Sequence, residues 1–206
     1  MTNSDNILVL DIETAGLNGY EKGDKVLSVG IVRLDLKMMK VLPVFYSAVW
    51  QYLDEKDREC WLFKNGHMDP EEVTNSPFGK VSAAEIIADI IEDEFVTTYN
   101  TAFDLDAFLD PWMDKVASVA KLYLRAPCIM KACTQVPEIP RTMHEDGTEW
   151  PSLSASYSTL CQQRIAQRRT PLRQHNALDD AIMAGEVLLE LIRRGLYDPE
   201  REEEYA

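Results

Sequence analysis

The stretch Ile7-Leu8-Val9-Leu10-Asp11-Ile12-Glu13 decides the fold class of this sequence. Four consecutive apolar residues are typical of a short strand that is buried on both faces, and such strands form the centre of α/β sheets. The apolar run stops at Asp11, so two acidic residues lie at the carboxyl end of the predicted strand. That end is where open α/β sheets bind their ligands.

The segments that follow extend this strand into a mixed sheet. Strands are predicted at residues 26–36, 41–50 and 95–99, and helices after Asp69 and at residues 83–91, 103–113, 152–163 and 177–194. Pro43 places the third strand at an edge, because proline cannot donate to a sheet ladder. Three strands, a crossover helix, another strand and then mostly helices predict an α/β domain.

Composition fits one globular domain. The chain has 206 residues, of which 46% are hydrophobic and 27% charged, and we expect a domain at residues 1–197 followed by an acidic tail at residues 198–206. The four cysteines lack the spacing of a zinc site and are expected to be reduced, buried thiols. The sequence shows no secretory signal pattern and no apolar run long enough for a membrane span. A soluble cytoplasmic protein without membrane partners is therefore expected.

The net charge of −14 argues against a general polyanion binder, because such a field repels phosphate backbones. The charge is unevenly distributed along the chain. Residues 111–180 carry nine basic and seven acidic side chains. Salt screens distant charges, so this segment is able to form a local basic face on an acidic protein.

Whether an Asp-x-Glu pair is a candidate functional site depends on the sequence around it. An Asp-x-Glu pattern begins at Asp11, Asp57, Asp69 and Asp198, and only the first copy follows a buried apolar strand. Two-residue spacing in an extended chain puts the carboxylates of Asp11 and Glu13 on the same side. We interpret this pair as functional, with solvated acids at a strand end as the alternative.

A second acidic residue follows the strand at residues 95–99. Asp104 begins the next helix, where an acid also favours the helix N-terminus for electrostatic reasons. If this strand is parallel and adjacent to the first, the two carboxyl ends meet at one edge of the sheet. Asp104 then lies close to Asp11 and Glu13, and helix capping is the alternative.

The helix that begins at Ala177 carries two adjacent aspartates with different surroundings. Asp180 shares its face with apolar residues such as Met183. Asp179 shares a polar stripe with Glu186. A carboxylate on an apolar face is costly unless it is paired or bound to a metal, so Asp180 is the candidate and Asp179 the solvated neighbour.

Histidine is the remaining candidate for acid–base chemistry. His175 stands at the entrance to the same helix, and its neutral form near pH 7 suits a general base, with a capping or surface histidine as the alternative. His67 is expected in a loop that precedes a helix. His144 is expected in an exposed polar loop.

Three motifs occur in a recognisable order. They are residues 11–17 (DIETAGL), residues 99–104 (YNTAFD), and His175 with Asp180. Together they resemble the motifs of the DnaQ-like 3′–5′ exonucleases of the DEDDh type, and the resemblance spans residues 7–195. Two small departures concern Ala15, where a second threonine is common, and Phe108, which lies four residues after Asp104 where an apolar residue usually lies three after.

The resemblance implies a ribonuclease H-like fold, with a mixed five-stranded sheet and helices on both faces. It also implies removal of 5′-mononucleotides from single-stranded 3′ ends of DNA. Asp11, Glu13 and Asp180 would hold one divalent ion, and Asp11 with Asp104 a second. His175 would be the general base. Hard oxygen ligands without cysteine suit Mg²⁺ or Mn²⁺, and two such ions activate water and stabilise the leaving oxygen.

Substrate contacts follow from the same resemblance. Thr14, Gly16 and Leu17 match the part of the family that cradles the terminal nucleotide. Asn100 and Phe103 are expected to support the same pocket. For Leu17 and Phe103, ordinary core packing is the alternative. The arginines at residues 168–173 lead directly to His175, so a phosphate clamp is predicted there, with solvated surface as the alternative.

Three other functions are compatible with the same candidate residues. The substrate could be RNA, as in exoribonucleases of the ribonuclease T or oligoribonuclease type, because sequence does not show what contacts a 2′-hydroxyl. A non-catalytic binding module that recruits a polymerase or another protein is a second alternative, which the complete set of acids argues against. Hydrolysis of a free nucleotide or nucleotide ester is a third.

Overall fold

The computed structural model describes residues 5–116, 123–143 and 147–201. Its centre is a five-stranded sheet in the order β3-β2-β1-β4-β5. The strands are β1 (Asn6–Thr14), β2 (Val26–Asp35), β3 (Lys40–Ala48), β4 (Phe95–Thr98) and β5 (Leu124–Arg125). The predicted loop at His144 and residues 202–206 of the predicted tail lie outside the described residues.

The pairing of β1 sets the architecture. β1 pairs with β2 antiparallel and with β4 parallel, with Leu10 opposite Thr98 at the carboxyl ends. β3, which contains Pro43, lies at the edge next to β2. The prediction of a mixed five-stranded α/β sheet with an edge strand at Pro43 is confirmed.

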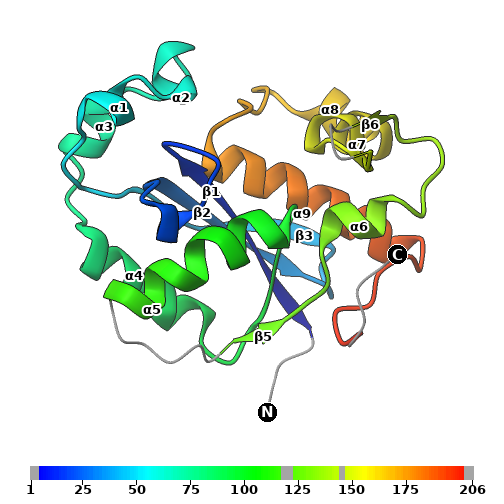
Figure 1. The fold of residues 1–206 in the computed structure, drawn as a ribbon. Coiled ribbons are helices and arrows are strands. Elements are labelled where there is room, and N and C mark those ends of the chain that lie inside the picture. The colour runs from blue at the N-terminus through cyan, green and yellow to red at the C-terminus, as the bar shows by residue number, and fades with distance from the viewer. Residues whose placement is uncertain (1–4, 117–122, 144–146, 202–206) are drawn as a thin grey trace.

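Helices lie on both faces of the sheet, as Figure 1 shows. They are η1 (Tyr20–Lys22), α1 (Glu55–Arg58), α2 (Trp61–Lys64), α3 (Pro70–Thr74), α4 (Lys80–Ile91), the π-helix η2 (Ala102–Leu109), α5 (Asp110–Val116), α6 (Ile129–Cys133), α7 (Leu153–Leu160), α8 (Gln162–Gln167) and α9 (Ala177–Arg193). A short hairpin joins β6 (Arg141–Met143) to β7 (Glu149–Pro151). The helix predicted at residues 152–163 is divided at Cys161 into α7 and α8.

Alternate residues of β1 belong to two cores. Ile7 and Val9 pack with α9, α7 and α6 on one face, whereas Leu8, Leu10 and Ile12 pack with α4, η2 and α5 on the other. Every one of these side chains is at least 96% buried. The run Ile7–Leu10 is thus apolar throughout because each residue meets a helical layer, as the sequence predicts.

A third, smaller core stands apart from the sheet. Residues 49–79, here called the β3–α4 segment, carry α1, α2 and α3 and pack around Leu53, Leu62 and Met68. A bridge between Trp50 and Gly79 closes the base of the segment. The segment therefore folds as a compact lobe beside the carboxyl end of β1.

Close backbone contact brings α9 onto the sheet. Gly30 of β2 lies opposite Asp11, and a Cβ atom at Gly30 would collide with the Ala177 carbonyl and the Leu178 nitrogen at the start of α9. A glycine in a strand interior often marks such an approach of another backbone. Gly30 therefore allows the first turn of α9 to lie against the acidic end of β1.

The four cysteines are buried free thiols, as predicted. None of the helices in the described ranges combines the length and apolar character needed to cross a membrane.

Candidate active site

The acidic pair of β1 faces α9. Asp11 and Glu13 continue the alternation of Ile7 and Val9, whose side chains pack on the α9 side of the sheet. Glu13 is buried, and Asp11 is partly exposed. The two carboxyl groups thus project from the end of a rigid central strand.

The start of α9 supplies the third carboxylate. Asn176 is the N-cap, and its side chain accepts the Asp179 N–H at 3.2 Å. Asp180 follows in the first turn and is buried, whereas Asp179 accepts the backbone N–H of Arg173 at 2.9 Å. The different environments of the two adjacent aspartates agree with the sequence prediction.

His175 has an unusual backbone conformation just before this helix. Its φ angle is 63°, in the left-handed region that non-glycine residues rarely occupy. The conformation directs the His175 backbone N–H to Asp180 Oδ2 at 2.8 Å. Strain of this kind concentrates at functional sites, where the surrounding structure holds it in place.

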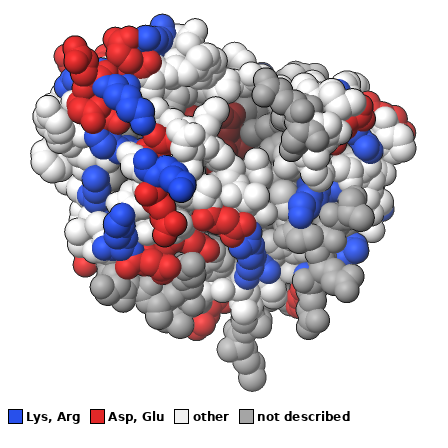
Figure 2. Space-filling view, viewed as in Figure 1, with Lys and Arg blue, Asp and Glu red and all other residues white. Residues whose placement is uncertain are grey.

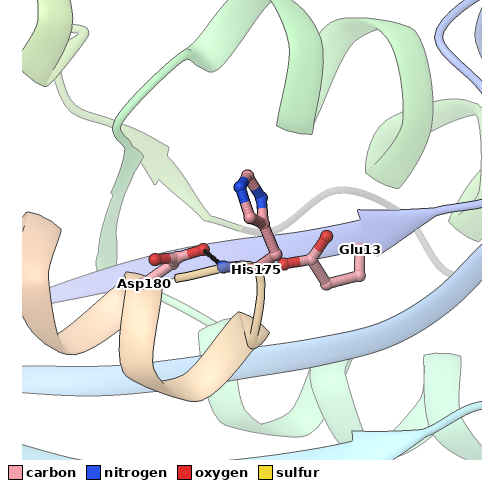
Figure 3. A group of neighbouring side chains, drawn as sticks. All are labelled: Glu13, His175 and Asp180. Carbon is pink, nitrogen blue, oxygen red and sulfur yellow. Dashed lines mark hydrogen bonds between the residues drawn. The ribbon is translucent and has the colours of Figure 1, made fainter. Parts of the chain in front are cut away.

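Glu13, His175 and Asp180 come together. One potential ligand atom from each residue lies within 4.8 Å of those of the other two. Figure 3 shows Glu13 entering from β1 and Asp180 from the first turn of α9, with His175 between them. This set of donors is able to hold a metal ion.

Asp104 completes the acidic cluster from the opposite side of β1. The parallel pairing of β1 with β4 brings η2, which follows β4, to the same sheet edge. Asp104 is 4% exposed there. Its charge, with those of Asp180 and Glu13, acts on Asp11, so the four carboxyl groups share one electrostatic environment.

The electrostatics of the cluster favour protonated acids. Burial, followed by the charges of Asp180 and Asp104, raises the pKa of Glu13 to about 8. Burial is the largest cause that raises the pKa of Asp104 and of Asp180 to about 7. The pKa of Asp11 lies well above its usual value for the same reasons. None of these shifts has a lysine or arginine among its causes, so no described cationic side chain offsets the negative charge that these acids acquire when they ionise.

His175 lies in a group of three rings. The ring centroids of Trp61 and His67 are 4.7 Å apart, those of Trp61 and His175 4.7 Å, and those of His67 and His175 4.6 Å. Burial, and then the neighbouring His67, lower the pKa of His175. The imidazole is therefore neutral at pH 7 and able to accept a proton.

A pocket of about 420 Å³ opens beside the cluster. It is lined by Ile12, Glu13, Thr14, Ala15, Gly16, Leu17, Trp61, Leu62, Phe103 and His175. Figure 2 shows that this face of the molecule is hollowed, with acidic side chains deep in the hollow. Leu17 is 82% exposed, so the alternative of core packing is wrong for this residue.

Asn100 differs from the other residues expected at the substrate. It is absent from the lining of the pocket, and its carbonyl accepts the backbone N–H groups of Phe103 and Asp104 at 3.0 and 2.9 Å. Asn100 thus begins the helical turn that carries Asp104. Thr14, Gly16, Leu17 and Phe103 all line the pocket.

The arginines before His175 are largely paired with acids. Arg168 donates to Glu186 at 2.6 Å, and Tyr157 donates to the same carboxylate at 3.0 Å. Glu186 is 6% exposed, so the stripe that it shares with Asp179 on α9 is buried at this position. Arg168 balances this buried charge, which contradicts a phosphate clamp at that position.

Sequence reasoning gave neither Trp61 nor His67 a role at the site. His67 was expected in a loop, and it does precede α3, but its ring lies beside His175. The contact depends on how the β3–α4 segment folds back over the sheet edge, which no local pattern reveals. The apolar triplet Trp61-Leu62-Phe63 within a polar stretch was the available signal.

Solved structures share this fold. Exonuclease I of E. coli in complex with a dA16 oligonucleotide aligns with a TM-score of 0.61 at 16% identity, over 94% of this chain and 42% of that chain. An apo Exonuclease I gives 0.64 at 14% identity, over 94% and 44%. Cell-death related nuclease 4 gives 0.61 at 17% identity, over 93% and 64%. This chain has the fold of these nucleases.

The likeness lies in structure, not in overall sequence. Neither a protein-family model nor a curated protein matches the sequence. The chain spans less than half the length of the Exonuclease I structures. The mixed sheet and its layers confirm the ribonuclease H-like fold expected from the three motifs.

Proposed function

We propose that this chain is a 3′–5′ exonuclease that removes 5′-mononucleotides from single-stranded 3′ ends of DNA with two divalent ions. The observation that carries the proposal is the convergence of four carboxyl groups without a compensating cation. Asp11 and Glu13 come from β1, Asp104 from η2 and Asp180 from α9. Buried negative charges require a positive partner, and no described lysine or arginine is among the charges that act on them.

The donor set fits Mg²⁺ or Mn²⁺. Carboxylate oxygens are hard ligands, and the buried cysteines lie elsewhere in the fold. Asp11, Glu13 and Asp180 would hold one ion, and Asp11 with Asp104 the other. When bound, such ions supply the positive charge that activates a water molecule and stabilises the leaving 3′ oxygen.

His175 acts as the general base. It stands at the rim of the acidic cluster, and its lowered pKa keeps the ring neutral at pH 7. The Nδ1 or Nε2 atom takes the proton of the attacking water. Its backbone N–H meanwhile fixes the orientation of Asp180.

The pocket receives the terminal nucleotide. Leu17, Trp61 and Phe103 give it apolar walls, and Glu13 and His175 lie at its inner end. Apolar and aromatic side chains contact nucleobases without selecting a sequence. Exonuclease I structures with dA16 and dT13 oligonucleotides support single-stranded DNA as the substrate of this fold.

The test uses 5′-labelled single-stranded DNA and RNA oligonucleotides, with Mg²⁺ or Mn²⁺ and with EDTA. We expect a ladder that shortens from the 3′ end, requires the metal and forms faster on DNA. Asp180→Asn should lower kcat by about 100-fold or more, because it removes a carboxylate from the metal site.

Asp179→Asn is the matched control, since Asp179 is adjacent and bonds Arg173 instead. It should leave kcat within about 2-fold, as surface substitutions usually have small effects. Faster cleavage of RNA would change the substrate to RNA. Metal binding without cleavage of either oligonucleotide would contradict the exonuclease and favour a nucleotide hydrolase. Absence of metal binding would favour a binding module.

A further inference from the structure

The orientation of the His175 ring lacks the usual support. A catalytic histidine is commonly held by a hydrogen bond from its second nitrogen to a carboxylate or carbonyl group. Among the described residues, the hydrogen bonds of His175 involve its backbone N–H and not its ring. The closest neighbours of the ring are instead two other rings, those of Trp61 and His67.

The two rings touch His175 and each other. Trp61 and His67 are stacked, with an interplanar angle of 19°. Each meets His175 in an edge arrangement, at 76° for Trp61 and 66° for His67. Edge contacts at these centroid distances are favourable for aromatic pairs and depend on direction. The stacked pair thus forms a corner against which the His175 ring rests.

The corner is part of a folded unit. Leu62 and Met68, the chain neighbours of Trp61 and His67, are buried in the core of the β3–α4 segment. The backbone N–H of His67 donates to the Leu62 carbonyl at 3.0 Å, which ties the two ring-bearing turns together. The backbone positions of Trp61 and His67 are therefore held by the packing of this segment, whereas both side chains are exposed and the rings are held by their contacts with one another and with His175.

Ion pairs attach the same segment to the acidic end of β1. Lys25, the last residue of the β1–β2 loop, pairs with the buried Asp57 of α1. Lys56 of α1 pairs with the buried Asp24 at 3.0 Å. Asp24 also accepts the backbone N–H of Asn18 at 2.8 Å, so the loop that lines the pocket and the lobe that carries the rings are joined.

We infer that His67, stacked on Trp61, is a positioning residue that holds the imidazole of His175 in its reactive orientation. This inference rests on the proposed function of His175 as the general base. His67 acts through ring contact, because its ring meets His175 and lies outside the lining of the pocket. Small errors in the placement of a base reduce the rate of reaction without weakening substrate binding.

The first test separates turnover from binding. His67→Ala should lower kcat on the labelled oligonucleotide by about 10- to 100-fold, with KM within about 2-fold. His67→Phe keeps a ring at this place and should restore most of kcat. Lys64→Ala, on α2 beside Trp61, is the control for changes in this segment, since Lys64 is exposed and pairs with Glu59. Equal losses in His67→Ala and His67→Phe would overturn the inference.

The second test does not depend on activity. The chain has three histidines, so the imidazole NMR signals of the full chain with Mg²⁺ are assignable by substitution. Trp61→Leu and His67→Ala should each shift the His175 ring protons, because nearby rings displace proton resonances. Unchanged His175 signals in both variants would overturn the inference, even in an active enzyme. An inactive wild-type enzyme with the expected shifts would contradict the proposed function and leave the ring contact supported.

Discussion

Asp11, Glu13, Asp104 and Asp180 link the chemistry of this protein to its stability. Their pKa values in the folded chain, about 7 for Asp104 and Asp180 and about 8 for Glu13, lie above those of the unfolded chain. At pH values between the carboxyl pKa values of the unfolded chain and those of the folded chain, the folded protein binds more protons than the unfolded one. The free energy of unfolding of the metal-free protein should therefore fall as the pH rises through this window.

The metal-free protein should therefore be less stable at neutral pH than at mildly acidic pH. Between about pH 5 and about pH 8 the metal-free protein should lose about 2 kcal/mol or more of its free energy of unfolding, since one pKa unit corresponds to about 1.4 kcal/mol. Saturating Mn²⁺ should reverse the loss, because it binds the ionised carboxylates of the folded state alone. Urea unfolding at both pH values, with and without Mn²⁺, measures both effects. A metal-free protein that becomes more stable with rising pH would contradict it.

The arginines before His175 have different roles at adjacent positions. Arg168 balances the buried Glu186, whereas Arg169 is exposed. Arg168→Ala should lower the free energy of unfolding by about 1–3 kcal/mol, because it removes the nearer cation from a buried carboxylate that keeps only the Tyr157 hydroxyl and Arg164 at 4.0 Å. Arg169→Ala should change it by less than about 0.5 kcal/mol, as expected at a surface position. Equal stabilities of the two variants in urea would show that Glu186 does not need Arg168.

At the scale of elements, the site depends on the approach of α9 to β2. Gly30→Ala should destabilise the fold by about 2–3 kcal/mol, because the added Cβ meets the backbone of Ala177 and Leu178. The same change should weaken Mn²⁺ binding, since Asp180 moves with the helix. Isothermal titration with Mn²⁺ and urea unfolding test the two effects.

Gly79→Ala provides the matched control. Gly79 has a φ angle of −75°, and an added Cβ there would have no neighbour within 4 Å. Its Mn²⁺ affinity should therefore stay near that of the wild type, and its free energy of unfolding should fall by no more than about 1 kcal/mol, since Gly79 is the N-cap of α4, where alanine is disfavoured. If Gly30→Ala has the same stability and Mn²⁺ affinity as Gly79→Ala, the close backbone contact at Gly30 does not position Asp180.

The local sequence pattern predicted the helices, the strands and the acidic site residues. It did not predict the contacts between segments that are distant in sequence. The apolar run Ile7–Leu10 and the helical phase of Asp180 were readable because each depends on near neighbours in sequence. The pairing of Glu186 with Arg168 and the contact of His67 with His175 depend on how α8 and the β3–α4 segment fold back. Such tertiary contacts leave no periodic signal, so nothing in the sequence indicated that Glu186 is buried or that His67 has a partner.

At the scale of the whole molecule, acidic side chains outnumber basic ones, and many of the described lysines and arginines pair with acids. Figure 2 shows acidic and basic side chains next to one another over the helices of the β3–α4 segment. Ion pairs also hold Arg125 to Asp106 and Arg173 to Asp179. With a net charge of −14, binding of nucleic acid is expected to depend on the proposed divalent ions more than on free basic side chains.

The salt dependence of binding tests this expectation. A single-stranded oligonucleotide with phosphorothioate linkages at its 3′ end should bind with a slope of log K against log salt of about −1, the slope expected when no more than about one or two phosphates meet cationic side chains. Binding should be lost in EDTA. Fluorescence anisotropy over a series of NaCl concentrations at fixed Mg²⁺ gives the slope. A slope steeper than about −4 would indicate an extensive basic track.

The π-helix η2 explains one irregularity of the second motif. Phe108 lies one residue farther from Asp104 than is usual in the resembling family, yet it is fully buried. A π-turn spans one residue more than an α-turn, so η2 accommodates an extra residue and still directs Phe108 into the core. In evolutionary terms η2 has the form of a single-residue insertion absorbed by widening the helix. Deleting the partly exposed Ala107 should therefore shorten the chain and convert the turn to an ordinary α-helix, with Asp104 and its neighbours left in register.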